Sequence, residues 1–437
     1  MESPVVVSPT RSEISKVTLA ATIGTMIEYY DYFIGSFAAG LVWPAVFFPS
    51  SNPVAASALS ISAFGSVFLT KPIGAYVFGH LGDKTGRKQT LILTLIAMGI
   101  GMLGIALTPS FATIGVLAPI SIVAFRVIFG FGTGGEFGGA ATWVSEFAAK
   151  SKWRSFWTSW AQTPVPIGLV LASFTFSFLS ASLARPVFMD WGWRVPFVLG
   201  AVIAVVGLVI RYRLEDAPVF KQLKSSGGLE KTPANQVLKK HWGRILLLAL
   251  SWTYMSALVS GLIAPYSIQY LTANHVSQTF ASLSVTYGAI VAIFTIMAGA
   301  ILGDVIGRKP VIAIGALLSM ILVYPYFQLL HTLNHLEIIL AQILLLGAIL
   351  FGTGVVSALF TEQFQTSLRY SGSGLAYQIG ALFTGILVTF VIPAIIVGAH
   401  GPVNAVTPMM ELGVGVAAVS LIAISVVKEG KKGTLMT

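Results

Sequence analysis

The sequence carries one short motif twice, as GDKTGRK over Gly82–Lys88 and as GDVIGRK over Gly303–Lys309. The second copy begins 221 residues after the first, and each copy lies between two long apolar stretches. Its glycines allow a tight turn, its aspartate can accept hydrogen bonds from the start of a neighbouring helix, and its arginine can bridge to another carboxylate. A charged turn repeated in this way predicts a chain built from two similar halves.

Three further landmarks repeat in the same order. The stretch Phe131–Gly134 recurs as Phe351–Gly354 at an offset of 220 residues. Two single charges follow at offsets of 216 and 215, with Glu146 matched by Glu362 and Arg154 by Arg369. Because four landmarks share almost one offset, we predict a duplicated unit, which forms two pseudo-symmetric bundles able to rock around a midplane site.

The composition places these halves in a membrane. The chain has 437 residues, of which 55% are hydrophobic and only 10% are charged, against about 25% charged in soluble domains. The apolar residues recur in blocks of about 20 or more, long enough for a helix to cross a bilayer. These blocks are too long and too unalternating for a β-barrel, and an open sheet would leave unpaired edges in lipid.

Twelve spans can be assigned along the chain. We expect them at 17–47, 56–80, 88–108, 112–147, 154–182, 192–213, 243–273, 279–303, 309–330, 335–363, 370–398 and 405–427. The predicted fold is therefore an all-α membrane protein with twelve transmembrane helices in two six-helix bundles. The bundles cover residues 1–213 and 243–437, and a polar cytoplasmic linker at 214–242 joins them.

The positive charges predict how the chain is oriented. Of the 26 lysines and arginines, 22 fall in alternate loops and at the termini, including a set from Arg211 to Arg244 assigned to the central linker. The opposite loops hold only Arg185 and Arg194. By the positive-inside rule, both termini and the linker are cytoplasmic, in a multi-pass protein of the cell membrane. The net charge of +10 therefore reflects membrane orientation. The sequence has no basic face interleaved with aromatic residues, so we expect no nucleic-acid partner.

The sequence gives no sign of an enzyme or a cofactor. It has no cysteine, and its six histidines all fall near span ends or in loops. It has neither a metal-ligand cluster nor a phosphate-binding loop. We therefore expect no metal and no cofactor, protons as the coupling ion, a small-molecule substrate, and a monomer in the lipid bilayer.

Five charged side chains fall deep inside predicted spans, and four of them are Glu28, Asp31, Lys71 and Arg126. Glu28 and Asp31 lie three residues apart on one face of the first span, so at least one must be protonated or paired with a cation. The available cations are Arg126 in the fourth span and Lys71, about 18 Å along the helix from Asp83. An Asp31–Arg126 pair can act as a proton switch or as a static salt bridge, and Lys71 can be functional or can snorkel.

The fourth span also holds a glycine series and Glu136. Gly130, Gly132 and Gly135 formally match a dinucleotide fingerprint, but no strand precedes them and the stretch is an apolar helix. Glycines spaced by four favour tight helix packing instead. We expect Glu136 to share the proton with Asp31 and Glu28, or to tune their site.

Several segments together resemble the metabolite:proton symporters of the major facilitator superfamily, over about residues 15–430. The resemblance rests on the two loop motifs and on five stretches. These stretches are 24–33, 126–140, 191–197, 213–220 and 369–378. It implies import of small carboxylates or zwitterions by alternating access, coupled to proton entry. Lys71 stands where this branch usually has arginine, Phe129 where it has glutamine, and Tyr29–Tyr30 where it has Trp-Tyr.

Together these observations assign expected roles. Substrate contacts are expected from seven side chains: Lys71, Arg126, Tyr30, Gln162, Trp252, Tyr377 and Gln378. A cytoplasmic gate is expected from eight charges: Asp83, Arg87, Glu146, Arg154, Asp304, Arg308, Glu362 and Arg369. A proton-coupled sugar symporter and a proton-driven exporter remain the alternatives, although the glutamine-rich signature of sugar porters is absent between Leu248 and Leu271.

Overall fold

A computed structural model describes residues 10–50, 53–213, 216 and 218–429, and every regular element in these ranges is helical. The first half contains α1 (Arg11–Leu41), α2 (Trp43–Val46), α3 (Pro53–Thr85), α4 (Arg87–Leu107), α5 (Phe111–Ile114), α6 (Leu117–Phe147), α7 (Arg154–Ser159), α8 (Pro164–Ser182), α9 (Arg185–Asp190), η1 (Gly192–Arg194) and α10 (Val195–Tyr212). The second half follows α11 (Pro218–Ser225) and contains α12 (Pro233–Ala257), η2 (Leu258–Tyr266), α13 (Ser267–Ala273), α14 (Gln278–Ile306), α15 (Arg308–His331), α16 (His335–Thr353), α17 (Val356–Glu362), α18 (Arg369–Ile386), η3 (Leu387–Val391), α19 (Ile392–Gly398) and α20 (Val406–Val426).

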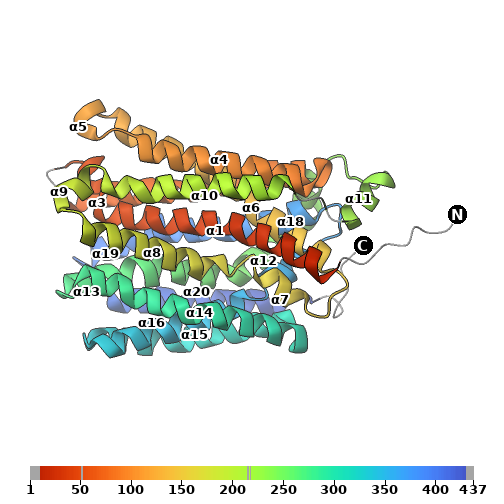
Figure 1. Ribbon diagram of the computed structural model, residues 1–437. Helices are drawn as coiled ribbons and strands as arrows, with labels where there is room; N and C mark the ends of the chain where they lie inside the picture. The colour runs from red at the N-terminus through yellow and green to blue at the C-terminus, as the bar shows by residue number, and fades with distance from the viewer. Residues whose placement is uncertain (1–9, 51–52, 214–215, 217, 430–437) are drawn as a thin grey trace.

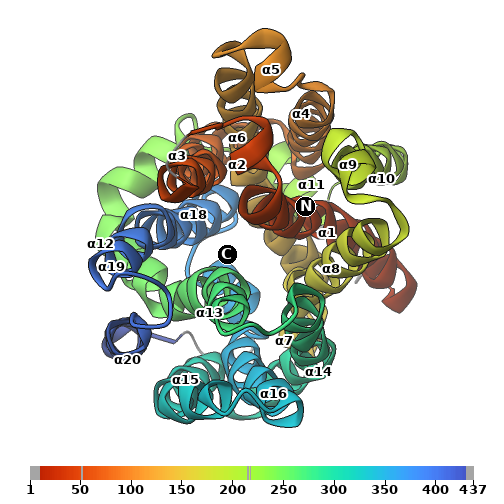
Figure 2. The same cartoon turned by 90° about the vertical axis from the view of Figure 1, so that its left-hand side faces the viewer.

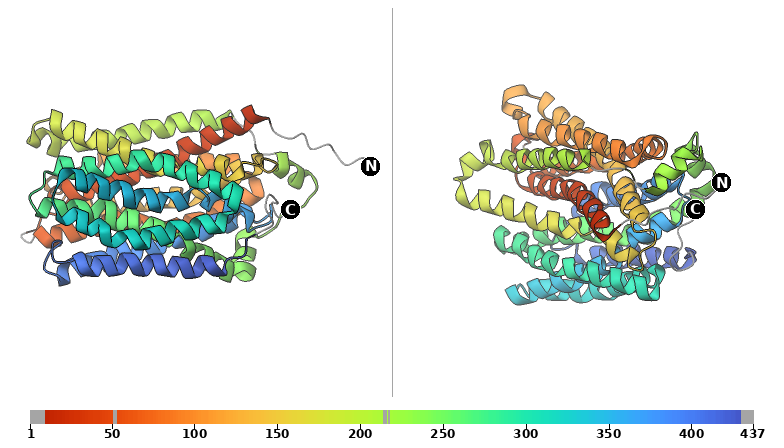
Figure 3. Two further views of the ribbon diagram at one scale, coloured as in Figure 1. Left: turned by 90° about the horizontal axis from the view of Figure 1, so that it is seen from below. Right: turned by 45° about the vertical axis from the view of Figure 1, so that its right-hand side comes forward.

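The long helices run side by side along one axis, as Figure 1 shows. In the described part of the chain, eleven helical stretches are long and apolar enough to cross a membrane. The 31-residue helix α1 completes the expected twelve, since it runs along the same axis and owes its lower hydropathy to charged residues such as Glu28 and Asp31. We call the end where α1 begins and α20 finishes the terminal end, and the opposite end the distal end (Figures 1 and 3). Viewed from the distal end, the two halves lie on either side of the bundle axis (Figure 2).

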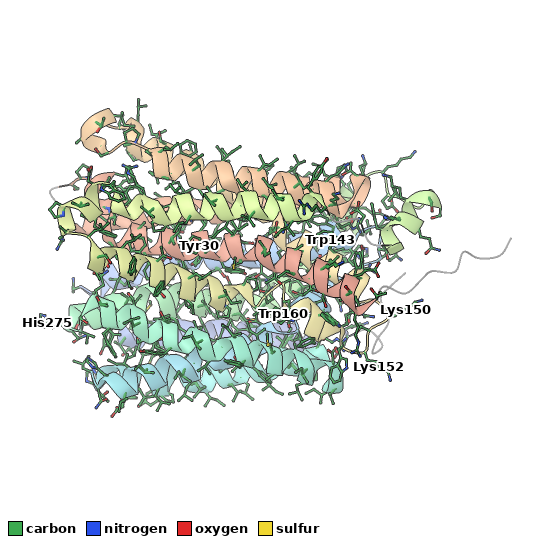
Figure 4. All side chains as sticks on the ribbon, in the orientation of Figure 1. Tyr30, Trp143, Lys150, Lys152, Trp160 and His275 are labelled. Atoms are coloured by element: carbon green, nitrogen blue, oxygen red, sulfur yellow. The ribbon has the colours of Figure 1, made fainter. Side chains whose placement is uncertain are left out.

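The side chains divide as a membrane environment requires. Large apolar residues such as Phe174, Phe294 and Ile422 are about two-thirds exposed on the outside of the bundle, with exposures of 66%, 68% and 67%. A soluble monomer rarely exposes so much apolar surface. Figure 4 shows Lys150 and Lys152 at the terminal end, His275 at the distal end, and Tyr30 between them. The apolar outside therefore faces lipid.

The repeated motif has the same conformation in both halves. Helix α3 ends at Thr85 and α4 starts at Arg87, and the intervening Gly86 has φ of 126°. In the second half, Gly307 has φ of 110° between α14 and α15. Glycine adopts this region without the steric cost that a side chain would impose. Both turns lie at the terminal end.

The spans are interrupted at places that the apolar pattern does not reveal. A π-helical segment, η2, contains Pro265, and another, η3, precedes Pro393 at the start of α19. Proline removes a backbone donor and displaces the helical hydrogen bonds, which explains breaks near both prolines. These irregular segments lie in the seventh and eleventh spans, whose first helices border the central pocket described below.

The region expected to be a polar linker is largely helical. It contains α11, and α12 already starts at Pro233 with a break in helical geometry at His241, whose φ is −126°. Arg211, which we had placed with the linker cations, is instead fully buried in the last turn of α10. That placement was wrong. A charged residue at the edge of an apolar block looks like a loop residue in the sequence, because the sequence does not show that its ion-pair partner lies on another helix.

Candidate functional site

A central pocket lies between the two halves, near the middle of the bundle. Helices α1, α3 and α8 of the first half and α12, η2, α16 and α18 of the second provide its walls. Its lining consists of Glu28, Tyr29, Tyr32, Phe33, Phe68, Lys71, Gln162, Val165, Trp252, Met255, Ser256, Val259, Ser260, Leu350, Thr353, Tyr377 and Ala381. The cavity measures about 50 Å³. Ligand pockets generally span about 300–1,000 Å³, so this cavity is small for a ligand pocket.

One ion pair forms part of the pocket wall. Lys71 Nζ lies 2.8 Å from Glu28 Oε1, and the two side chains are only 8% and 2% exposed. The lysine ammonium also lies 5.4 Å from the centre of the Phe68 ring. The second carboxylate oxygen of Glu28 has no hydrogen-bond partner among the described residues. A buried carboxylate oxygen without a partner is costly, so the pair has unused hydrogen-bonding capacity at the pocket.

A second ion pair lies beside the pocket, outside its lining. Arg126 Nη1 donates to Asp31 Oδ2 at 2.6 Å, and both side chains are fully buried. The guanidinium packs near the rings of Phe64 and Phe129, with its central carbon 5.1 and 5.5 Å from their centroids. Gly35 leaves the space that the guanidinium needs, because an added Cβ there would lie 3.1 Å from Arg126 Nη1.

This second pair is also incompletely satisfied. Asp31 Oδ1, Arg126 Nε and Arg126 Nη2 have no hydrogen-bond partner in the described part of the chain. In a low-dielectric interior, such a pair holds its charges only while the two partners remain together. The expected Asp31–Arg126 pairing is present, but in this conformation Arg126 cannot touch a ligand in the pocket.

Aromatic residues from both halves close the pocket. The Tyr377 ring of α18 is stacked between Phe137 and Trp252, with centroid separations of 3.5 and 3.9 Å. Its hydroxyl lies 2.6 Å from that of Tyr29 on α1, and it donates to Gln162 Oε1 at 3.4 Å. Gln162 Nε2 remains unpartnered within the described chain. The contacts of Tyr377 therefore hold the two halves together at the level of the pocket.

Besides Arg126, two expected substrate contacts lie outside the pocket lining. Tyr30 is 3% exposed and belongs to the apolar core of the first half, while its neighbour Tyr29 lines the pocket. The helical period explains this difference, because Glu28, Tyr29, Tyr32 and Phe33 share one face of α1 and Tyr30 does not. Gln378 is fully buried behind Tyr377 and donates to the backbone oxygen of Thr133 at 3.2 Å.

Glu136 has a partner that we did not predict. Arg211 of α10 binds both of its carboxylate oxygens, and Thr94 donates to Oε2 at 2.9 Å. Gly24 of α1 lies against the guanidinium so closely that any side chain there would collide with it. Glu136 is thus held in a bidentate pair outside the pocket lining, which favours a structural role over the expected sharing of a proton with Asp31.

The repeated motifs meet at the terminal end in a network that joins the halves. We call it the latch, and it consists of Asp83, Arg87, Glu146, Arg154, Asp304, Arg308, Glu362 and Arg369. Asp83 accepts hydrogen bonds from the backbone nitrogens of Tyr370 and Ser371, at 3.3 and 2.9 Å, where α18 begins in the other half. Asp304 accepts in the same way from Ser155 and Phe156 of α7, at 2.9 and 3.0 Å. Each aspartate therefore binds the start of a helix from the opposite half.

Ion pairs complete the latch symmetrically. Glu146 accepts from Arg87 of its own half at 3.0 Å and from Arg369 of the other half at 3.3 Å. Its counterpart Glu362 lies 3.2 Å from Arg308 and 3.0 Å from Arg154. Since these pairs connect the halves beyond the pocket, the terminal end is closed in this structure.

Sequence reasoning missed several pocket residues. Tyr32, Ser256, Ser260 and Thr353 line the cavity, but single hydroxyl groups in apolar helices are too common to stand out. Tyr29 could have been found, because it lies one residue from Glu28 on the same helix face. The partner of Glu136 could have been sought, because a buried carboxylate requires a cation.

Comparison with known proteins places the chain in a family. The model for the family "Sugar (and other) transporter" matches residues 16–245 and 238–436. The chain is 35% identical over 381 residues to the inner membrane metabolite transport protein YhjE of Escherichia coli, and the aligned region covers 84% of each chain. It is 31% identical over 414 residues to the shikimate transporter of E. coli, covering 94% of each. It is 32% identical over 388 residues to the proline/betaine transporter of Salmonella typhimurium, covering 86% of this chain and 77% of the relative.

Solved structures support the same fold. The proton:xylose symporter XylE, a member of the major facilitator superfamily, superposes with a TM-score of 0.76 at 19% identity, covering 97% of this chain and 98% of XylE. The inward-open form of XylE from E. coli gives a TM-score of 0.71 at 20% identity, with 97% and 98% coverage. The relatives are transporters rather than enzymes. Together with the duplicated motif and the twelve helices, these matches show that the chain belongs to the sugar (and other) transporter family of the major facilitator superfamily, as a multi-pass metabolite transporter of the bacterial inner-membrane type.

Proposed function

We propose that this protein imports a small carboxylate or zwitterionic metabolite together with protons. The observation that carries the proposal is the Lys71–Glu28 pair in the pocket wall. A carboxylate entering the pocket would replace Glu28 as the partner of the ammonium, which binds it as a point charge. Glu28 would then be left as an unpaired buried carboxylate and would take up a proton.

The rest of the lining suits a compact, partly polar ligand. Trp252, Phe68 and Tyr377 offer aromatic surface, and Tyr29, Gln162 and Ser260 offer hydrogen bonds. The relatives named above transport shikimate, a cyclic acid, and proline and betaine, which are zwitterions. All of these ligands carry a carboxylate that Lys71 could bind, so both the site and the relatives support the proposed substrate class.

Asp31 is the proposed principal proton carrier, and Arg126 its switchable partner. While the guanidinium is bound, Asp31 remains ionised. When a conformational change draws Arg126 away, the isolated carboxylate binds a proton in its apolar surroundings. Proton binding at Asp31 and rearrangement of the helices are therefore linked, which is the requirement for coupled transport.

The membrane orientation and assembly belong to the same proposal. The basic loops mark the terminal end as cytoplasmic, so that the closed latch leaves the pocket facing the outer side. The transport unit is one chain that uses protons and no cofactor.

Uptake into proteoliposomes with an imposed pH gradient tests this function. The purified chain should accumulate labelled shikimate, proline or glycine betaine when the outside is acidic, and dissipating the gradient should abolish accumulation. Counterflow with labelled sugars beside the labelled acids tests the sugar-symporter alternative. Accumulation of a sugar but of none of the carboxylates would overturn the proposal.

A further inference from the structure

A second cavity lies between the two halves on the distal side of the central pocket. It measures about 270 Å³ and is lined by side chains of α1, α8 and α9 from the first half and of α14 from the second. Its volume approaches the lower limit of about 300 Å³ for ligand pockets, whereas the central pocket has about 50 Å³. In this conformation, the outer cavity is thus the larger space available to a small molecule.

The outer cavity has an exposed distal rim that includes Arg185, Gln278 and Thr279, and its polar groups lie on helix faces that differ from the most exposed apolar ones. Ser173 and Ser177 of α8 line it, while Phe174 and Phe178 on another face of the same helix are 66% and 58% exposed to the outside. On α14, Ser282 lines the cavity and the adjacent Leu283 is 36% exposed. The polar groups therefore point into the space between the halves.

The two cavities are stacked along the same helices. Phe33 of α1 lines the central pocket, and Phe37 and Leu41, one and two turns further along the same face, line the outer cavity. Helix α8 repeats the arrangement, with Val165 at the central pocket and Ser173 at the outer cavity. A ligand that moves along α1 and α8 from the distal side to the central pocket would cross the outer cavity.

A hydrogen bond and an aromatic contact lie at the inner side of the outer cavity. Ser173 Oγ lies 2.7 Å from Thr286 Oγ1 of the other half, and the Phe37 and Phe176 rings lie 5.7 Å apart. One neutral hydrogen bond contributes only about 1 kcal/mol. This contact is far weaker than the ionic latch at the terminal end.

The chemistry of the outer cavity favours an anion. Arg185 is the one charged residue of its lining, and the remaining lining groups are neutral hydroxyl, amide and apolar side chains. In the described part of the chain, Arg185 has no hydrogen bond or ion pair, whereas Arg194 is bonded to the backbone oxygens of Ala106 and Thr108. Arg185 is thus available to a ligand, and a guanidinium can bind a carboxylate in bidentate geometry.

We propose that the outer cavity is a loading site for small carboxylates, in which Arg185 holds the anionic group before the Ser173–Thr286 contact opens. This inference rests on the proposed transport of carboxylates, but the cavity and its charge can be tested without transport. Hydroxyls on facing helices also occur where helices simply pack together. Here only Ser173 bonds across to α14, while Ser177 and Ser282 face open space.

The absence of native cysteine permits a direct test by thiol labelling. Ser177→Cys places a thiol in the outer cavity, and Ala112→Cys places one on exposed α5 at the same end as a control. Each variant is reconstituted and labelled from the distal side with anionic sulfonatoethyl or cationic trimethylammonioethyl methanethiosulfonate. The ratio of the two rates reports the local potential and cancels any effect of Arg185 on the reactivity of the thiol.

We expect the anion-to-cation ratio at Ser177→Cys to exceed that at Ala112→Cys about fivefold, as one nearby and partly screened positive charge would produce. Arg185→Gln should abolish this excess, and Arg185→Lys should keep most of it. Millimolar shikimate should slow labelling at Ser177→Cys with Arg185 present and have less effect in Arg185→Gln. A ratio equal to the control, a ratio unchanged by Arg185→Gln, or no protection by shikimate would overturn the loading site.

These outcomes differ from failure of the proposed function. If none of the carboxylate probes is accumulated but the labelling ratio and the protection are as expected, the anion site is supported and carboxylate symport is refuted. If accumulation is observed and the labelling ratio equals that of the control, symport is supported and the loading site is refuted.

Discussion

Glu146 connects the two halves through ion pairs, as its counterpart Glu362 does, and it is the more deeply buried of the two. Its Oε1 accepts from Arg87 at 3.0 Å and from Arg369 at 3.3 Å, and all three side chains are fully buried. Glu146→Gln removes the negative charge while keeping the shape of the side chain. Two guanidiniums from opposite halves would then face each other with a neutral amide between them. The closed terminal end should lose stability relative to a conformation in which these groups reach water.

The size of the effect follows from the burial of the partners. Breaking a buried ion pair by removing one partner costs about 3–5 kcal/mol, and the lower figure applies because the amide oxygen still accepts a hydrogen bond. A cost of about 3 kcal/mol corresponds to a shift of roughly 150-fold in the equilibrium between closed and open terminal ends. Even a third of that free energy would change the equilibrium about fivefold.

Thiol accessibility measures this equilibrium. Ser373 of α18 is fully buried near the latch and lies 3.4 Å from Thr142 of the other half. In a Ser373→Cys background, Glu146→Gln should accelerate labelling from the terminal side about 100-fold. Ser420→Cys lies inside the second half, where Ser420 accepts from the backbone of Tyr254, and should remain unlabelled unless the protein unfolds.

The control charge change is Glu411→Gln, because Glu411 is exposed on α20. It should leave the Ser373→Cys rate unaltered. If Ser373→Cys is labelled at the same rate with and without Glu146→Gln, the latch does not hold the terminal end closed. Our interpretation of the network would then be wrong. If Ser420→Cys becomes reactive as well, the variant has lost its fold, and the matched substitution Glu362→Gln in the second half repeats the test.

Four further predictions separate transport roles from packing roles. Asp31→Asn should retain counterflow of labelled substrate but lose accumulation driven by a pH gradient, and uphill uptake by this variant would contradict the carrier role. Lys71→Gln should raise KM for carboxylates about tenfold, since one charged hydrogen bond contributes about 1.5–3 kcal/mol, whereas Lys71→Arg should keep KM near the wild-type value. If KM is the same for Lys71→Gln and the wild type, Lys71 does not bind the substrate. Glu136→Gln should lower the melting temperature by several degrees without changing the number of protons per substrate, and a changed ratio in transport assays would restore its proton role. Gly134→Ala should lower the melting temperature, because its Cβ would collide with the backbone of α3. Gly40→Ala is the control and should not lower it, because nothing lies within 4 Å of a Cβ at Gly40.

The sequence was sufficient to predict the fold and the largest part of the charged framework. The duplicated motif, the length of the apolar blocks and the few charges inside them follow from local rules, because lipid solvates neither a backbone donor nor an unpaired charge. The Asp31–Arg126 and Glu28–Lys71 pairs could be expected for the same reason. Five mid-span charges, two positive and three negative, leave few ways to neutralise one another.

Other features depend on the register between helices, which composition does not contain. Arg211 lies at the edge of its span, and only the packing of α10 against α4 and α1 shows that it is buried against Glu136. The latch was expected from its residues, but the sequence could not show that Asp83 and Asp304 each bind the opposite half. Nor could it show the outer cavity, because the space depends on how far α8 and α14 separate.

Helix α18 offers a physical link between the latch and the pocket. Tyr370 at its start donates its backbone nitrogen to Asp83 and its hydroxyl to the Gly135 carbonyl oxygen. Tyr377, about 10 Å further along the same helix, is stacked between Phe137 and Trp252 and contacts the Tyr29 hydroxyl. A helix of 18 residues moves largely as a rigid body, so opening the latch must also shift Tyr377. Conversely, a ligand that displaces Tyr377 from Tyr29 removes one of the contacts that keep the terminal end closed. Substrate binding and opening of the latch are therefore two effects on the same helix, and a substrate that fills the pocket without moving Tyr377 would bind without being transported.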